Sequence, residues 1–262
     1  MSYMNWIMGP RRSLVALAFT ALFGAASPAV AQDGGTFELD AELGASLFFG
    51  ASSQTAVLVR NGIEWNGPSR EFAASWGFDY GEAEDGDGGR FVNKRSWTFQ
   101  TSADYLPGGR LSPFIFATAE GSYERQIDFR TSGGAGAKYR FVDNEQTRVD
   151  FSLAALLERT DPRQPAGLDS EVTSIGRWSA RLRVRQAITD AAGFELVSFY
   201  RPRMGDFDDN SWDVNASVQV ALSSTFGVRL SLVNKYDSMA ESRGARSNHD
   251  GRAYFSIVAA VR

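Results

Sequence analysis

The chain has 262 residues, 43% of them hydrophobic and 22% charged, with a formal net charge of -4, one histidine and no cysteine. This length suits one large all-β domain or two small ones, and the mildly acidic balance lacks the clustered basic surface that nucleic-acid binding requires. The sequence therefore excludes a disulfide framework and thiolate or histidine-rich metal sites, and we expect no nucleic-acid partner, no metal and no cofactor.

The first predicted element is an export signal. Two arginines precede a short apolar stretch at residues 14–26. The small residues Ala29 and Ala31 then stand three residues and one residue before an expected cleavage site, which precedes Gln32. A membrane anchor is the alternative, but the apolar stretch is shorter than the ~20 residues that a spanning helix needs. Residues 1–31 are therefore predicted to be a cleaved signal peptide.

After Gln32 the chain alternates with a period of two residues, which is typical of strands with one apolar and one polar face. In the segment 149–158, for example, every odd-numbered residue is apolar, whereas Asp150, Ser152 and Glu158 lie on the other face. About twelve such segments are expected, near residues 37–49, 54–65, 70–82, 91–106, 112–124, 133–142, 146–158, 177–188, 193–203, 211–222, 226–237 and 252–262. Most of them reach the ~9–11 residues that cross a bilayer at a tilt.

The connections between these segments alternate in length. Short ones lie at 66–69, 107–110, 143–145, 189–192 and 223–225, and longer polar ones include 83–90, 159–176, 204–210 and 238–251. Outer-membrane barrels have short periplasmic turns, long extracellular loops and an even number of strands. A soluble two-sheet sandwich is the alternative, but it gives no reason to sort the connections in this way. Aromatic residues towards strand ends, such as Trp97, Tyr139 and Trp178, fit girdles at the two membrane interfaces.

The polar face of the strands determines what the interior of such a barrel could do. Its predicted lining consists of Arg177, Arg181, Arg183, Arg185, Arg201, Arg203, Arg229, Lys138, Arg140, Glu38, Asp40, Glu42, Glu120, Asp150 and Asp213. One wall is acidic and another is basic. The interior is either filled by matched ion pairs, or it is a narrow water-filled pore whose transverse field favours small anionic or zwitterionic solutes.

Counting residues across neighbouring antiparallel strands predicts specific pairs in this lining. The expected ion pairs are Glu158 with Arg177, Asp213 with Arg201, and Asp150 with Arg183 or Arg185. The same counting places Arg181 near Arg201, and it leaves Arg181 and Arg203 short of acidic partners.

Candidate catalytic and metal-binding residues are few. His249 lies beside Ser247 and Asp250 in the last long connection, and a Ser-His-Asp grouping within one loop is not expected to hold triad geometry. We expect a solvated loop histidine. The acidic, glycine-rich stretch 82–89 could bind calcium weakly, but its spacing does not match the Asp-x-Asp-x-Asp-Gly template, so a solvated loop is expected.

One long run has a distinctive sequence. It consists of Glu120-Gly121-Ser122-Tyr123-Glu124-Arg125, Arg130, Gly134-Ala135-Gly136-Ala137-Lys138-Tyr139-Arg140 and Asn144-Glu145-Gln146-Thr147-Arg148-Val149. This run resembles the salt-induced outer-membrane protein family, known as domain of unknown function 481. The resemblance implies an outer-membrane barrel whose abundance responds to salt or envelope stress, and it implies no catalytic residues. The chain departs from the family pattern at Ala51, where asparagine is usual, and at its final Arg262, where such barrels usually carry an aromatic residue.

The sequence as a whole predicts an all-β fold: a closed antiparallel transmembrane β-barrel of about twelve strands over residues 32–262. We expect a non-enzymatic, monomeric protein of the bacterial outer membrane with a structural or stress-related role in the envelope. Its expected partners are outer-membrane lipid and lipopolysaccharide, together with the barrel-assembly machinery and periplasmic chaperones during biogenesis. A small-solute channel is the alternative, and an outer-membrane hydrolase is a distant one.

Overall fold

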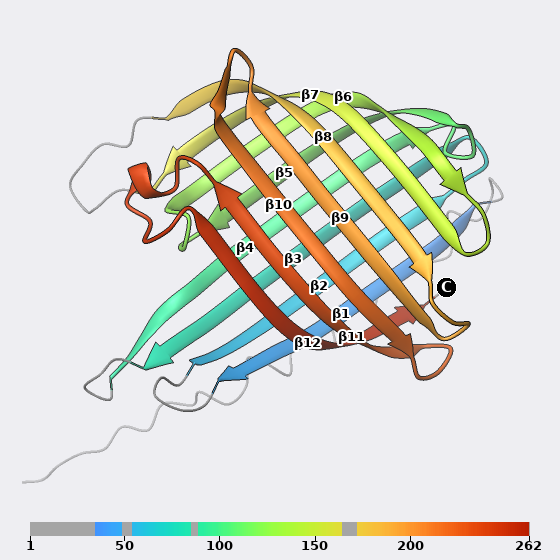
Figure 1. Cartoon of the computed structure of the whole chain (residues 1–262), viewed down its shortest axis with the longest axis horizontal. Helices are drawn as coiled ribbons and strands as arrows, with labels where there is room; N and C mark the ends of the chain where they lie inside the picture. The colour runs from blue at the N-terminus through green and yellow to red at the C-terminus, as the bar shows by residue number, and fades with distance from the viewer. Residues whose placement is uncertain (1–34, 49–53, 85–88, 164–171, 262) are drawn as a thin grey trace, which may run out of the picture. The chain divides into compact units, whose positions relative to one another are not determined.

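The computed structural model describes residues 35–48, 54–84, 89–163 and 172–261. In this part of the chain, twelve antiparallel strands form one closed barrel (Figure 1). The strands are β1 (Thr36–Phe48), β2 (Gln54–Asn66), β3 (Arg70–Glu84), β4 (Arg90–Tyr105), β5 (Leu111–Ser122), β6 (Ile127–Asp143), β7 (Thr147–Pro162), β8 (Thr173–Ala187), β9 (Ala192–Arg203), β10 (Asp206–Ala221), β11 (Phe226–Asp237) and β12 (His249–Val261). Each strand pairs with its neighbours in the sequence, and β1 closes the barrel against β12 over seven residue pairs. This closed order confirms the predicted barrel and rules out a two-sheet sandwich.

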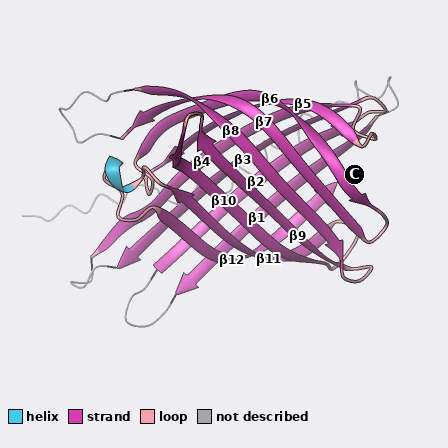
Figure 2. Ribbon diagram, turned by 45° about the horizontal axis from the view of Figure 1, so that its top comes forward, coloured by secondary structure: helices cyan, strands magenta, loops and turns pink. Residues whose placement is uncertain are grey.

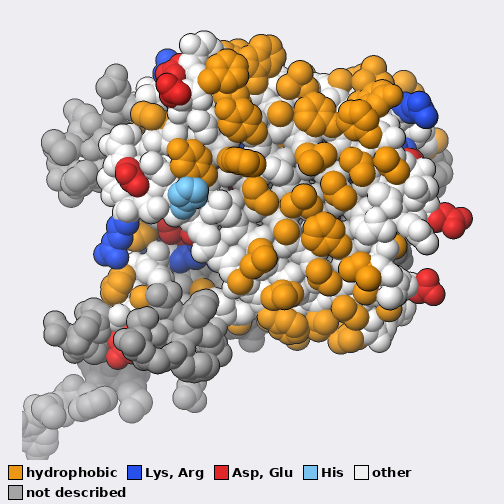
Figure 3. Space-filling view, viewed as in Figure 1, with side chains coloured by type: hydrophobic (Ala, Val, Ile, Leu, Met, Phe, Trp, Pro, Cys, Tyr) orange, Lys and Arg blue, Asp and Glu red, His pale blue; other side chains and the backbone are white. Residues whose placement is uncertain are grey.

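The alternation within β7 shows how the sequence specifies two faces. Phe151, Leu153 and Leu157 point outward and are 37%, 51% and 76% exposed, whereas Asp150 and Ser152 point inward and are 4% and 3% exposed. On the face seen in Figure 3, apolar side chains cover most of the barrel wall, and charged side chains lie mainly towards its two ends. An apolar surface of this extent is unfavourable in water and is solvated by lipid.

Aromatic residues of the predicted girdles stand on this exterior. Tyr105, Phe141 and Phe226 lie at or near the ends of β4 and β6 and the start of β11, and they are 50%, 61% and 55% exposed. Tyr139 makes an edge contact with Phe141, with ring centroids 5.0 Å apart. These strand ends all meet at the same end of the barrel, so they form an aromatic belt there.

Short turns join the strands at this end, which we call the turn side. Three of these turns use the same local device. The side-chain oxygens of Asn144, Thr189 and Ser223 each accept hydrogen bonds from the backbone N–H groups two and three residues later. Asparagine, threonine and serine are favoured at such positions because their side chains satisfy backbone donors in the turn. The predicted short connections are therefore confirmed.

The other end of the barrel, the loop side, differs from the prediction in detail (Figure 2). The residues 204–210 were expected to form a long connection, but β9 and β10 are joined at Met204–Gly205, where Gly205 has a φ of +83°. Likewise β5 and β6 are joined by a turn at residues 123–126. The strands β6, β7, β8, β10 and β12 all continue three to six residues further on this side than their predicted bounds. In two of these extensions a charged side chain binds inside the barrel, Arg130 in β6 and Asp209 in β10.

The extension of β12 includes His249. This histidine was expected in a loop, but it is the first residue of the strand. The predicted signal peptide, with Ala29, Ala31 and Gln32, lies outside the described residues, and so do Asp85 and Asp87 of the acidic stretch. No helix within the described ranges is long and apolar enough to cross a membrane.

Candidate functional site: the charged interior of the barrel

Strand parity and cross-strand partners place all fifteen predicted lining residues on the inward face of the barrel. They do not form one site. They divide between a set of buried ion pairs on the loop side and an open cavity on the turn side. Their part in lining a conducting pore stays a prediction.

Arg130 of β6 lies at the centre of the loop-side ion pairs. Its Nη2 is 3.2 Å from Asp237 Oδ2, its Nη1 is 3.4 Å from Glu120 Oε1, and its Nε donates a hydrogen bond to Thr160 Oγ1 at 2.9 Å. Asp237 is on β11, and four strands separate β11 from β6 on the shorter way round the barrel. The contact between Arg130 and Asp237 therefore crosses the interior.

The same carboxylates also hold the turn and the connection above them. Glu120 Oε2 lies 2.5 Å from Arg125 Nη2 in the β5–β6 turn, and Asp237 Oδ2 lies 2.6 Å from Arg243 Nη2 in the β11–β12 connection. Burial opposes the charge of Arg125, but the carboxylates of Glu120, Asp213 and Asp237 together outweigh burial and hold the pKa of the Arg125 guanidinium above its ordinary value. Arg243 Nε also donates to the backbone oxygen of Arg125 at 3.3 Å, so this connection is tied down over the barrel.

A second branch continues along the neighbouring strands. Glu158 Oε1 is 3.8 Å from Arg130 Nε and 3.0 Å from Arg177 Nε. Arg177 Nη2 in turn lies 2.7 Å from Asp209 Oδ1. We call the whole set the cross-barrel network: Glu120, Arg125, Arg130, Glu158, Arg177, Asp209, Asp237 and Arg243. Six of its eight members are buried, all but Glu120 and Arg243. Removing one partner from such a network leaves an uncompensated buried charge, which typically costs about 3–5 kcal/mol.

Further contacts cross the remaining part of the loop side, around a smaller cavity of about 210 Å³. Lys94 of β4 reaches Asp250 of β12 at 2.9 Å, and Arg252 of β12 reaches Asp79 of β3 at 2.9 Å. Arg60 of β2 donates a hydrogen bond to the hydroxyl of Tyr254 on β12. Ion pairs and hydrogen bonds therefore link strands that are not neighbours on both sides of the interior at this level.

On the turn side the interior opens into a cavity of about 670 Å³, which we call the vestibule. Strands β6 to β9 give it a basic wall, made of Lys138, Arg148, Arg181, Arg183, Arg185 and Arg201. Strands β1 to β3 give it an acidic wall, which includes Glu38, Glu64 and Glu71. A further space of about 440 Å³ adjoins it at the turns and shares Arg148 and Arg185 with it. Of the predicted acidic residues Glu38, Asp40 and Glu42, only Glu38 lines the vestibule, together with Glu64 and Glu71.

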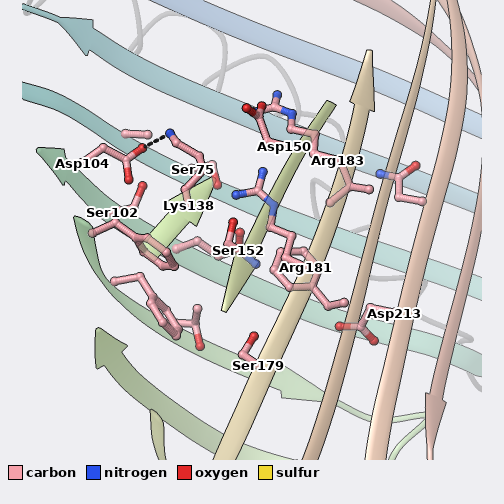
Figure 4. A pocket seen from close by; sticks show the side chains of 18 of the residues that line it. Ser75, Ser102, Asp104, Lys138, Asp150, Ser152, Ser179, Arg181, Arg183 and Asp213 are labelled. Atoms are coloured by element: carbon pink, nitrogen blue, oxygen red, sulfur yellow. Dashed lines mark hydrogen bonds and ion pairs between the residues drawn. The ribbon is translucent and has the colours of Figure 1, made fainter. Parts of the chain in front are cut away.

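Most charges of the basic wall have partners, and Figure 4 shows one such pair, Lys138 with Asp104. The pairs, with N–O distances, are Lys138–Asp104 at 2.8 Å, Arg201–Asp213 at 2.8 Å, Arg183–Glu195 at 2.7 Å, Arg185–Glu195 at 3.1 Å, Arg148–Asp150 at 3.1 Å and Arg140–Asp150 at 3.5 Å. The predicted pairs of Asp213 with Arg201 and of Glu158 with Arg177 are confirmed. Asp150 stands opposite Arg183 in the register, but its carboxylate binds other arginines.

Two predictions concerned arginines without partners. For Arg203 the prediction is wrong, because its Nη1 lies 3.8 Å from Asp209 Oδ2, a residue of the strand extension that was read as a loop. Arg181 makes no ion pair within the part of the chain that the structure describes, and its Nε is buried without a hydrogen-bond partner. Arg181 and Arg201 do lie close together, because both guanidinium groups contact the ring of Phe199, at 5.4 and 4.3 Å from its centroid.

The candidate catalytic grouping does not converge. The His249 ring packs against Tyr236, with centroids 4.8 Å apart, and Ser247 Oγ accepts a hydrogen bond from the His249 backbone. Asp250 points to the opposite face, where Lys94 binds it. Within the described ranges no group of three or more histidine, aspartate or glutamate side chains is arranged to hold a metal ion.

Comparisons with known proteins agree with this architecture. The model of the family described as "Protein of unknown function, DUF481" matches residues 41–260. No curated protein matches the sequence. The NanC porin has a TM-score of 0.50 at 10% identity, with 84% of this chain and 98% of that chain covered. An outer-membrane channel from Pseudomonas putida F1 has a TM-score of 0.50 at 10% identity, with 86% and 94% covered.

The translocator domain of the autotransporter NalP from Neisseria meningitidis has a TM-score of 0.47 at 13% identity, with 95% of this chain and 96% of that chain covered. At such identities the likeness to the two barrels with the higher scores concerns the fold alone. The family match covers most of the sequence and includes the distinctive run around Glu120 to Val149. The chain therefore belongs to the DUF481 family, and its fold is that of the outer-membrane β-barrel proteins.

Proposed function

We propose that the protein is a non-enzymatic barrel of the bacterial outer membrane with a structural, stress-related role in the envelope. The apolar exterior supports contact with lipid and lipopolysaccharide, and the sorting of the connections supports a periplasmic turn side. The chain acts as a monomer, and the barrel-assembly machinery and periplasmic chaperones bring it to the membrane. The resemblance to the salt-induced family supports a response to salt or envelope stress.

The observation that carries the structural role is the cross-barrel network. An open pore needs a continuous hydrated path, whereas Arg130 and Asp237 meet across the interior and are only 6% and 2% exposed. Such charges keep their geometry because each would otherwise be buried without a partner. A barrel closed in this way on its loop side resists solute flow and serves as a rigid envelope element.

Planar-bilayer recording of the refolded full-length chain tests this role. We expect the protein to insert without a steady conductance at moderate voltage, and flotation with liposomes confirms insertion in the same preparation. A wild-type protein that conducts steadily from the moment of insertion would overturn the structural proposal.

A second candidate is a narrow channel for small anionic or zwitterionic solutes, and the vestibule favours it. The cavity brings a charged space of about 670 Å³ well into the barrel, and its basic wall would attract anions. Such a channel must open its loop side in response to voltage or a solute. Openings at high voltage whose reversal potential in a KCl gradient shows anion preference would support the channel, and silence at every voltage would leave the structural role.

A further inference from the structure

Eight lysine and arginine side chains line the vestibule among the described residues: Arg60, Lys138, Arg148, Arg181, Arg183, Arg185, Arg201 and Lys235. Six of them lie within 4.0 Å of a carboxylate. Lys235 does not, but it stands in the register between Asp213 and Asp250, so acidic residues flank it on both sides. Arg181 stands in the register between Ser152 and Phe199, neither of which carries a charge.

The surroundings of Arg181 place no carboxylate in direct contact with it. The next inward-facing residues on its own strand are Ser179 and Arg183, so none of its four closest neighbours on the wall has a carboxylate. The acids elsewhere on this wall already bind other arginines or a lysine. Figure 4 shows the Arg181 side chain reaching into the cavity near Ser152 and Arg183, with no interaction drawn to any labelled residue.

A guanidinium has five N–H donors in a planar fork, which matches the two oxygens of a carboxylate. A buried donor without a partner is unfavourable, and Arg181 Nε is such a donor. Two hydroxyl side chains, Ser152 and Ser179, and the apolar ring of Phe199 surround it. The set thus offers a fork for an anion, hydroxyls for further polar groups and a flat surface for carbon atoms.

We propose that Arg181 anchors a binding site in the vestibule for a small organic carboxylate, whose carboxylate takes the place of the missing acidic partner. A volume of about 670 Å³ is in the range of small-molecule pockets, ~300–1,000 Å³. The ligand enters from the turn side, where the vestibule adjoins the space between the turns. The site goes beyond the structural role and does not depend on it. The structural role rests on the cross-barrel network of the loop side, whereas the site lies in the vestibule of the turn side.

Two kinds of carboxylate could use this anchor. A hydroxylated acid would add hydrogen bonds to Ser152 and Ser179. A zwitterion would instead extend its ammonium group towards Glu64 and Glu71, on the opposite wall of the vestibule. The carboxylate is common to both, and the choice between them is made by experiment.

Isothermal titration calorimetry on the refolded full-length barrel in detergent tests the site. The probes are gluconate, which is a hydroxylated carboxylate, sorbitol, which has the same carbon chain without the carboxylate, and glutamate as the amino acid. We expect gluconate or glutamate to bind and sorbitol not to bind. Replacing Arg181→Gln should weaken the binding about 10–100-fold, the loss expected for a hydrogen-bonded charge.

The matched control is Arg148→Gln, which removes the same charge from the same wall but leaves Asp150 with Arg140. It should change the affinity by less than about threefold. If Arg181→Gln does not fold, Arg181→Lys keeps a cation in place, and it should retain measurable but weaker binding. The proposal is wrong if no carboxylate binds to the wild type, or if both glutamine variants weaken binding equally, since binding would then follow the net charge of the lumen. Conductance plays no part in this test, so the structural role and the site can fail separately.

Discussion

The two halves of the barrel interior use the same residue types in opposite ways. In the cross-barrel network, the positive and negative groups alternate in space, and most of them are buried. In the vestibule, most arginines and the lysine Lys138 pair with carboxylates of their own or nearby strands, so the charges stay along the wall around a cavity. Ion pairs that reach across the interior fill a lumen, whereas ion pairs that run along the wall leave space for water or a ligand. Charge composition alone therefore does not distinguish a plug from a pore.

Stability measurements give the largest expected contrast between the halves. Replacing Arg130→Gln leaves Glu120 and Asp237 with less compensation in a buried setting, and it should lower the free energy of unfolding by about 3–5 kcal/mol. Arg183→Gln in the vestibule should cost only ~0–1 kcal/mol, because its partner Glu195 is 35% exposed and keeps Arg185. Urea titration followed by the gel mobility of the folded barrel measures both. Equal losses would mean that the vestibule is as dry as the network.

A second comparison sets the exterior of the barrel against its interior. An arginine placed on the exterior should lower stability more than an arginine placed on the inward face. Leu153→Arg places a charge on the exterior in the middle of β7, and it should cost about 2–4 kcal/mol in lipid. Ser217→Arg is the matched change on the inward face, where Glu195 stands opposite, and it should cost much less. Refolding into liposomes at increasing urea measures the difference. Similar costs would contradict a lipid-facing exterior.

Chemical labelling of single cysteines should distinguish the loop side of the barrel from its turn side, with little effect on stability. The chain has no cysteine, so single cysteines report cleanly. Ser242→Cys lies in the β11–β12 connection and Glu145→Cys in a short turn, and both positions are exposed. A membrane-impermeant maleimide added to intact cells should label position 242 and spare position 145, which should react only after lysis. The opposite pattern would place the vestibule mouth at the cell surface.

The strands could be predicted from the sequence wherever they face lipid. Alternation of apolar and polar residues is strict in segments such as 149–158, and each of the twelve predicted strands is present. The loop-side end of β6 was missed: residues 127–130 alternate between apolar and charged, but the register shifts there, so that Ile127 is buried and Phe129 exposed. Those residues continue the strand because Arg130 is bound inside the barrel, a tertiary contact that periodicity does not report.

Some of the ion pairs could also be predicted from the sequence, and others could not. Glu158 with Arg177 and Asp213 with Arg201 lie on neighbouring strands, so counting residues across neighbouring antiparallel strands was enough to predict them. Arg130 and Asp237 are 107 residues apart and belong to strands that do not touch. Their contact follows from the width of the closed barrel and the length of an arginine side chain, and neither is visible in a local pattern. The partner of Arg203 was missed because Asp209 was assigned to a loop.

The most direct test of closure by the cross-barrel network is the conductance of the double variant Arg130→Gln, Asp237→Asn, recorded beside the wild type. The two changes remove one positive and one negative charge, so the net charge of the lumen is unchanged, while the contact across the interior loses its ionic character. Gel mobility selects folded protein for both samples. We predict a silent wild type and a variant that conducts steadily, with ions passing from the vestibule to the loop side. A folded variant as silent as the wild type, or a wild type that already conducts, would contradict closure by this network.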